Sequence, residues 1–203
     1  MTCKINADTS NGLKLISDTS GIIELQNNGT TIATANSAGI TMASGKKVFA
    51  TGTILQVVQG RTKTLFTTAS GTFADIGLTA AITPSSSSSK ILVICNINGI
   101  FLSAVAGSFG SLILLRGSTN VTGDSGAPYL GYPVGFDEAA KARATSQTFT
   151  YLDSPSTTGA TTYKVQAAQV GGVTINFQRD AQVYSTIQLL EIAGWVLWTN
   201  MMQ

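Results

Sequence analysis

The chain contains no histidine among its 203 residues, and this absence limits the chemistry open to its other polar side chains. Histidine is the commonest general acid and base in enzymes and a frequent zinc ligand. Two cysteines are present, Cys3 and Cys95, which do not make a disulfide framework. Cys95 lies within the apolar run ILVICNI, where a cysteine usually serves as a small buried side chain. We therefore expect no metal site and no cofactor.

Two local patterns could still carry catalysis. The turn Gly123-Asp124-Ser125-Gly126 has the form of a loop that presents a nucleophilic serine, but no histidine can take its hydroxyl proton. Asp137 and Glu138 are the only adjacent carboxylates, and their side chains would point in different directions in a strand or a helix. Sugar hydrolysis needs two carboxylates at a set distance, and residues distant in the sequence could supply them. We expect that the chain is not an enzyme, with polysaccharide cleavage as a remote alternative.

A binding surface is better supported than a catalytic site. The stretch from Thr122 to Ser146 is rich in glycine, proline, aromatic and charged residues, which favours a long loop with one or two helical turns at most. Aromatic rings on a loop can stack on sugars, and charged groups can bind sugar hydroxyls. Alternatively, the rings pin the loop to its own core or to a neighbouring subunit. The candidates for contact with a receptor are Tyr129, Tyr132, Phe136, Asp137 and Glu138.

The overall charge excludes several partners. Charged residues make up 11% of the chain, against about 25% in an average protein. The net charge is +2 and no basic stripe is present, so we expect no binding to nucleic acid. The longest apolar run, 91–107, is interrupted by Asn96 and Asn98 and falls short of the ~20 residues of a membrane helix. The first ten residues lack the apolar core of a signal peptide, so we expect synthesis in a cytosol without membrane insertion.

The elements that must carry these residues are strands. Between Gly12 and Gly52, glycines alternate with short runs rich in β-branched residues, and Asn28-Gly29 is typical of a tight hairpin turn. Each run offers too few large apolar side chains to cover both faces of a sheet, so the segment is predicted to close against copies of itself. The candidates for packing in an oligomer or against a partner are Ile23, Leu25, Ile32, Ile40, Trp195 and Trp198.

After Gly52 the strands become longer and more apolar. The two strongest are 90–102 and 111–116, which are apolar on both faces and are expected in the middle of a sandwich or barrel. Pro84 and the serines 85–89 are expected to form a surface loop without buried residues. Strands recur at roughly ten-residue spacing to Ile192, as in an antiparallel sandwich or jelly roll. The apolar tail that contains the two tryptophans is expected to pack on an oligomer axis or another protein.

The sequence also resembles a known family. The stretch SDTSGIIELQNNGTTIATANSAGITMASGKK is similar to the N-terminal module of tail-fibre and related structural proteins of marine bacteriophages and cyanophages. The segments SSSSSKILVICNINGI, LILLRGSTN, YLDSPSTTGATTYKVQ and STIQLLEIAG resemble the C-terminal head domain of those proteins. The resemblance covers 18–194 and consists of turns and strand cores, with no catalytic motif.

The resemblance implies an all-β homotrimer. Residues 1–52 would form a short β-meander that attaches to other virion proteins, and residues 53–203 a jelly-roll or β-sandwich head pointing outward. The chain departs from the longer family members in having almost no shaft, and in its apolar tail after Ile192. The expected role is a short tail fibre whose head contacts a host surface glycan during adsorption. The alternative is a capsid decoration or head-fibre protein; in either case the chain would be assembled in the bacterial cytoplasm and lie on the virion.

Overall fold

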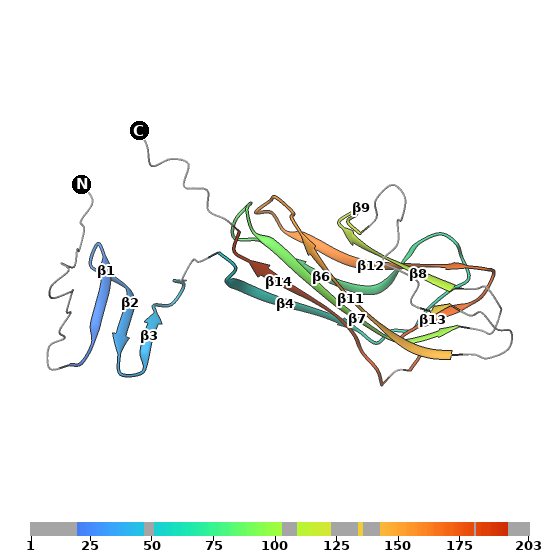
Figure 1. Ribbon diagram of the computed structural model, residues 1–203, viewed down its shortest axis with the longest axis horizontal. Coiled ribbons are helices and arrows are strands. Elements are labelled where there is room, and N and C mark those ends of the chain that lie inside the picture. The colour runs from blue at the N-terminus through green and yellow to red at the C-terminus, as the bar shows by residue number, and fades with distance from the viewer. Residues whose placement is uncertain are drawn as a thin grey trace, which may run out of the picture. The chain divides into compact units, whose positions relative to one another are not determined.

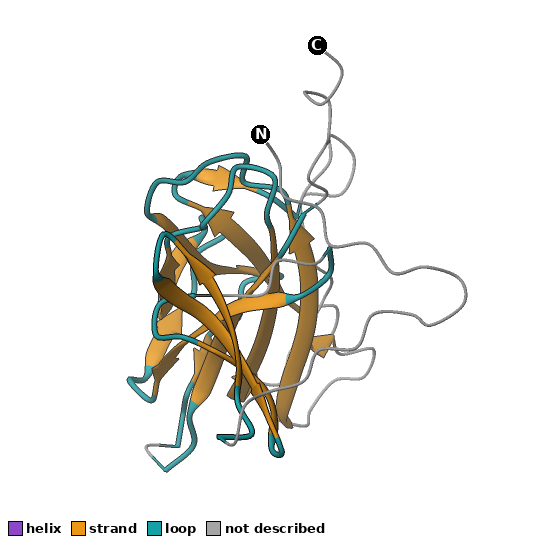
Figure 2. Ribbon diagram, turned by 90° about the vertical axis from the view of Figure 1, so that its left-hand side faces the viewer, coloured by secondary structure: helices purple, strands orange, loops and turns teal. Residues whose placement is uncertain are grey.

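The computed structural model of the chain describes residues 20–46, 51–102, 109–122, 134–135, 143–180 and 182–194. Within these residues the chain is entirely strands and loops, as Figure 2 shows. No helix among them is long and apolar enough to cross a membrane. The chain divides into two compact units, Met1–Phe49 and Ala50–Gln203, which are described separately below.

The first unit contains a three-stranded antiparallel sheet in the order β1-β2-β3. Its strands are β1 (Ile23–Asn27), β2 (Thr30–Asn36) and β3 (Gly39–Met42). The two-residue connection between β1 and β2 is Asn28-Gly29, and both residues have positive φ, 49° and 74°. The predicted tight hairpin is therefore confirmed, because asparagine and glycine tolerate this backbone conformation better than other residues.

One face of this small sheet is apolar. The register aligns Ile23, Ala35 and Ile40 in one row across the three strands, and Leu25, Ala33 and Met42 in the next row on the same face. Ala33 is buried, but Leu25 and Ile40 expose 53% and 77% of their surface. Ile32 lies at the register shift between β1 and β2 and belongs to neither row. Three of the four packing candidates in this unit, Ile23, Leu25 and Ile40, thus share a face.

The second unit is an antiparallel β-sandwich, which confirms the predicted fold class (Figure 1). Its six-stranded sheet has the order β4-β14-β7-β13-β5, with β11 paired to β7. These strands are β4 (Ile54–Thr62), β5 (Phe66–Thr68), β7 (Lys90–Leu102), β11 (Arg143–Asp153), β13 (Ile175–Phe177) and β14 (Ser185–Ile192). The five-stranded sheet has the order β10-β8-β12-β6, with β9 paired to β8. These strands are β6 (Ala74–Ile82), β8 (Phe109–Arg116), β9 (Thr119–Asn120), β10 (Val134–Gly135) and β12 (Thr161–Val170).

The core lies between the two sheets and is built from alternate residues of each strand. β7 contributes Ile91, Val93, Cys95 and Ile97, all fully buried, and β8 is buried on both faces along most of its length. Cys95 is therefore the small buried side chain expected from its surroundings, and burial raises the pKa of its thiol to about 12. Alternation of this kind hides the apolar face of each strand from water, which is the main force that holds the sandwich together.

A bulge in β7 changes which residues face the core. Before the bulge the buried residues have odd numbers, and after it they are Ile100 and Leu102. The register confirms the shift, because Gln147 pairs with Ile97 whereas Thr145 pairs with Ile100. Gly99 occupies the bulge with φ of 63°, and a Cβ there would press on the backbone of Arg179. The bulge turns Phe101 to the outer face of the sheet.

The strands define two ends of the sandwich. At the base end β4 begins, β14 ends, and the turns 83–89 and 154–160 join β6 to β7 and β11 to β12. At the opposite end, termed the loop end, short connections join β4 to β5 and β13 to β14. Because Arg143 pairs with Leu102, the connection that leads into β11 also reaches the sheet at the loop end. In Figure 1 the base end lies on the left of the sandwich and the loop end on the right.

The outer face of the six-stranded sheet carries an unusual set of aliphatic side chains. Val57, Leu190, Leu92 and Leu152 stand opposite one another on four adjacent strands, β4, β14, β7 and β11. Val57 and Leu152 expose 60% and 55% of their surface. These four residues are termed the apolar row. A continuous aliphatic row on the solvent face of a sheet is typical of a surface that packs against another element or protein.

Three expectations about individual segments were wrong. The sequence predicts two short strands, 73–76 and 78–82, but the structure has one strand, β6, which continues through Gly77. β11 begins at Arg143, so the last residues of the expected 122–146 loop are strand, because they pair with the end of β7. The serine loop before β7 is not wholly on the surface: Ser89 is buried, because its hydroxyl bonds to the buried carboxylate of Glu191.

Candidate functional site

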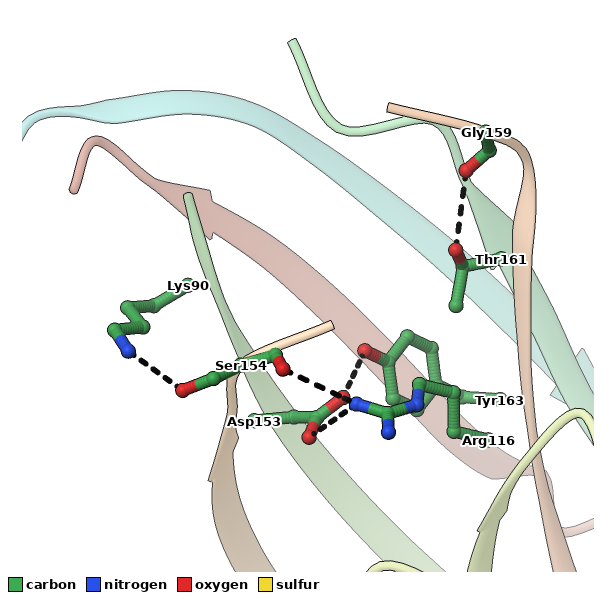
Figure 3. A network of polar contacts seen from close by, with 7 residues as sticks. All are labelled: Lys90, Arg116, Asp153, Ser154, Gly159, Thr161 and Tyr163. Carbon is green, nitrogen blue, oxygen red and sulfur yellow. Dashed lines mark hydrogen bonds and ion pairs between the residues drawn. The ribbon is translucent and has the colours of Figure 1, made fainter. Parts of the chain in front are cut away.

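The base end of the sandwich contains a compact group of polar residues that could be taken for an active site (Figure 3). Asp153, at the end of β11, is buried and accepts a 2.6 Å hydrogen bond from the hydroxyl of Tyr163 on β12. Nη1 of Arg116, on β8, lies 2.9 Å and 2.8 Å from the two carboxylate oxygens of Asp153. Burial and, to a smaller extent, the hydrogen bond to Asp153 raise the pKa of Tyr163, so the phenol keeps its proton.

This group joins the two sheets and is best explained as structural. β11 belongs to one sheet, whereas β8 and β12 belong to the other. The carboxylate of Asp153 is occupied by Arg116 and Tyr163, and Arg116 also donates to the carbonyl oxygen of Ser154, 3.3 Å away. Lys90 donates to the hydroxyl of Ser154 at the edge of the group. Both oxygens of this buried carboxylate accept hydrogen bonds from the protein itself, which satisfies the group and favours a structural role.

A second buried carboxylate, Glu191, lies in the same row of the sheet. Both Glu191 on β14 and Asp153 on β11 stand opposite Ile91 of β7, on either side of it. Oε1 of Glu191 accepts bonds from Ser89 Oγ at 2.6 Å and from the amide and hydroxyl of Ser85, both at 2.7 Å. Oε2 accepts a 2.6 Å bond from Gln56.

These two carboxylates do not form a sugar-cleaving pair. A glycosidase needs one acid whose pKa is raised so that it can donate a proton. Burial alone would raise the pKa of Glu191, but the hydrogen bonds from Ser89, Ser85 and Gln56 outweigh burial and lower it. Within the described part of the chain, no cluster of three histidine, cysteine, aspartate or glutamate residues could hold a metal ion.

The loop end carries a different arrangement, in which cations lie over aromatic rings. The guanidinium carbon of Arg61, at the end of β4, is 5.1 Å from the ring centroid of Tyr184. Lys63, two residues further on, has its Nζ 5.7 Å from the same ring. Tyr184 directly precedes β14 and exposes 41% of its surface. The backbone of Tyr184 is held in place, because the side chain of Asn98 donates a 2.6 Å hydrogen bond to its carbonyl oxygen.

A second pair of this kind lies nearby on the same sheet. The guanidinium carbon of Arg179, just after β13, is 3.6 Å from the ring centroid of Phe101 on β7. The amide of Arg179 donates to the carbonyl of Gly99, next to the Asn98 that holds Tyr184. Tyr184 and Thr186 share the outer face, and Thr186 pairs with Asn96 of β7, so Phe101 lies only a few residues further along β7. We term these five residues, Arg61, Lys63, Arg179, Tyr184 and Phe101, the cationic face.

The cations of this face have no carboxylate partner among the described residues. Those residues contain two ion pairs, Arg116 with Asp153 and Lys164 with Asp75, and both lie elsewhere. Asp180 follows Arg179 directly, but its Oδ1 accepts a bond from the amide of Gln182. A guanidinium that lies over a ring still has N–H groups in its own plane that can donate to two oxygens of an anion. The cationic face can therefore bind a carboxylate, sulfate or phosphate group.

The residues predicted as receptor contacts lie outside the described residues. This applies to Tyr129, Tyr132, Phe136, Asp137 and Glu138, so their role stays a prediction. The packing candidates Trp195 and Trp198 also lie outside. β11, the strand that follows the predicted receptor loop, begins at the loop end, because Arg143 pairs with Leu102.

Sequence reasoning missed the cationic face altogether. Its five members come from four separate parts of the chain, and none lies in a motif with recognisable spacing. The only available signal was the pair Arg61 and Lys63, which alternate at the end of a strand and must share a face if the strand continues. Their ring partner, Tyr184, is more than a hundred residues away and only the sheet brings it close.

Comparison with known proteins finds similar solved structures but no match in sequence. No protein-family model matches the chain, and no curated protein matches it in sequence. The chain is similar to the VP2 subviral particle of infectious bursal disease virus, with a TM-score of 0.40 and 12% identity over 93% of this chain and 46% of that one. A mutant VP2 of that virus in derived T=1 particles gives a TM-score of 0.37 and 10% identity, over 93% of this chain and 50% of that one. The Gt strain of the virus gives a TM-score of 0.34 and 12% identity, over 96% and 52%.

The chain thus spans about half the length of these viral proteins. The first two are VP2 in particles, and the third is a structure of the virus itself. At these TM-scores the folds coincide only in part, so the likeness by itself says nothing of what this chain does.

Proposed function

We propose that the chain is a virion structural protein, a short homotrimeric tail fibre whose sandwich contacts the host cell with its loop end. One observation supports this role above the others: the two ends of the sandwich differ in kind. The base end, where the chain enters β4, holds its charges in buried networks around Asp153 and Glu191. The loop end bears exposed cations over aromatic rings and holds the start of β11. Binding residues usually lie on loops and strand ends of a rigid scaffold.

The first unit would attach the fibre to other virion proteins. Its sheet leaves Leu25 and Ile40 exposed on the apolar face that they share with Ile23 and Met42, and only Ala33 is buried among the described hydrophobic residues of this unit. A three-stranded sheet in water gains stability only when such a face is covered. Three copies around one axis, or another virion protein, would provide the cover. The resemblance to marine phage tail-fibre modules supports the same assignment.

The test is adsorption of the purified full-length chain to bacterial cells. We expect a fluorescently labelled trimer to bind a subset of a strain panel that includes marine cyanobacteria. Tyr129→Ala combined with Tyr132→Ala should abolish binding while the melting temperature of the trimer stays nearly unchanged. Failure of the unmodified chain to bind any strain would contradict a role in adsorption. Loss of the trimer in the double variant would instead assign the loop to the subunit interface.

The location on the virion needs a separate measurement. Cryo-electron microscopy of intact particles should place a few tens of copies on the tail. A hundred or more copies spread over the capsid would contradict the tail-fibre assignment and support a decoration protein. We also propose that the chain has no catalytic role, and a fall in the viscosity of host polysaccharide on addition of the protein would contradict this.

A further inference from the structure

We propose that the cationic face binds an acidic polysaccharide, one whose sugars carry carboxylate or sulfate groups. This inference rests on the proposed role in host contact and specifies the ligand of the loop end. The anion site is built from described residues alone, the arginines and the lysine of the cationic face.

Both arginines of the cationic face are held against aromatic rings. Arg179 lies against the ring of Phe101 at 3.6 Å, and Arg61 lies over Tyr184 at 5.1 Å. Each ring stands on a strand or is fixed to one, since Asn98 holds the backbone of Tyr184. A guanidinium that is already held on a ring loses little entropy when it binds an anion, and its fork of N–H groups matches a carboxylate or a sulfate.

The charges are spaced along and across the strands. Arg61 on β4 stands in the row of Asn96, two strands away from β7, and Phe101 lies five residues further along β7. At about 3.3 Å per residue along a strand and about 4.8 Å between strands, the backbone positions of the two cation–ring pairs are roughly 15–20 Å apart on one face. Two fixed cations at such a separation suit a ligand that repeats its negative charges along a chain.

The groups beside the cations favour a polysaccharide over a nucleic acid. The outer face carries uncharged side chains with hydroxyl and amide groups there: Thr186 and Asn96 in the row of Arg61, and Gln59 and Gln188 in the next row toward the base end. Such groups bind the hydroxyls of sugars. Nucleic acid binding relies on many cations along the phosphate backbone, and three cations are too few for it.

The experiment measures binding of the full-length chain to four probes. These are alginate, which carries carboxylates, dextran sulfate, neutral dextran and duplex DNA. We expect binding to alginate or dextran sulfate and none to neutral dextran or DNA. Arg61→Gln and Arg179→Gln should each weaken binding at least about tenfold, because each removes a charge-assisted bond. Lys46→Gln, which removes an exposed lysine from the first unit, is the matched control and should change nothing.

Two further variants separate binding from folding. Arg179→Lys keeps the charge but lacks the planar fork, so it should fold normally and still bind several-fold more weakly. Thermal melting of each variant shows whether the sandwich is intact. The inference is overturned if no acidic polysaccharide binds, if DNA binds as tightly, or if Lys46→Gln weakens binding as much as Arg179→Gln.

Cell adsorption distinguishes failure of this inference from failure of the proposed function. If cells bind the chain but neither alginate nor the arginine substitutions affect adsorption, the receptor is of another class and the adsorption role stands. If acidic polysaccharide binds with the expected arginine dependence but no strain adsorbs the chain, the ligand class stands and the adsorption role does not.

Discussion

At the scale of single residues, the buried carboxylate of Glu191 is the group that most needs hydrogen-bond partners. It lies beneath the serine loop, and four donors from Ser85, Ser89 and Gln56 surround its two oxygens. A buried anion is costly unless such bonds replace water. Here they more than compensate for burial, because the pKa of Glu191 is lowered. The serine loop is thus positioned by a charge at the end of the last strand.

We predict that Glu191→Leu destabilises the protein by about 3 kcal/mol, because four donors lose their acceptor at once. The sign of the pH dependence follows from the lowered pKa of Glu191. Its contribution to stability is present at neutral pH and is lost as the pH falls below about 4. The melting temperature of the unchanged protein should therefore drop in acid more steeply than that of the variant. Equal slopes for the two proteins would contradict a stabilising charge at this position.

Ser89→Ala provides the matched control. It removes one bond from Glu191 and leaves the other donors in place. Its expected loss of stability is about 1.5 kcal/mol, so its stability should lie between that of the unchanged protein and that of Glu191→Leu. Asp75 also has a lowered pKa and contributes in the same direction, so the comparison is made between variants that all retain Asp75.

At the scale of elements, the apolar row on the six-stranded sheet is the clearest sign of assembly. The row crosses four strands without a polar side chain, and its outer members, Val57 and Leu152, are more than half exposed. Each such side chain gains roughly 1.5–3 kcal/mol when fully buried. Packing between copies of the sandwich would supply that burial.

We predict that Val57→Asp combined with Leu152→Asp dissociates the oligomer and leaves the sandwich folded, because both side chains point away from the core. Sedimentation velocity at micromolar concentration measures the oligomer, and far-ultraviolet circular dichroism measures the fold. Thr162→Asp, an exposed position on the other sheet, is the control and should leave the oligomer unchanged. A stable monomer of the unmodified protein would contradict the homotrimer, and an intact trimer in the double variant would exclude this face as its interface.

The elements could be predicted from the sequence wherever the signal is local. The Asn28-Gly29 turn specifies its hairpin through backbone geometry, and the apolar run around Cys95 specifies a buried strand through composition. The buried Ser89 could not be predicted, because its partner Glu191 is distant in the sequence and the serine run resembles a solvated loop. The bulge at Gly99 is equally hidden, although it decides that Phe101 faces outward. The cationic face depends on both kinds of information: the bulge turns Phe101 outward, and only the sheet brings Tyr184 next to Arg61.

At the scale of the whole chain, the two units differ in how they can be stable. The sandwich has a core of its own between two sheets. The small sheet of the first unit buries only Ala33 among its described hydrophobic residues. The sandwich therefore supplies most of the stability of a single chain.

We predict that a fragment comprising residues 50–203 folds without the first unit. Its thermal unfolding should be cooperative and centred close to the main transition of the full-length chain, with a β-rich circular dichroism spectrum. The first unit alone, residues 1–49, should show no cooperative transition at low concentration, because its apolar face is uncovered. An unfolded 50–203 fragment would contradict the division of the chain into an attachment unit and an independent sandwich.

The pairing of β4 with β14 also determines how the sandwich would respond to tension. β4 begins at the base end and is antiparallel to β14 from Ile54 opposite Ile192 to Thr62 opposite Ser185. Ala193 extends this pairing through bonds to Gly52 and Thr53. A pull between a tethered first unit and a ligand held at the loop end would run along these strands. The ladder would then be loaded in shear, with its hydrogen bonds sharing the force, whereas a pull across the strands would break them one after another.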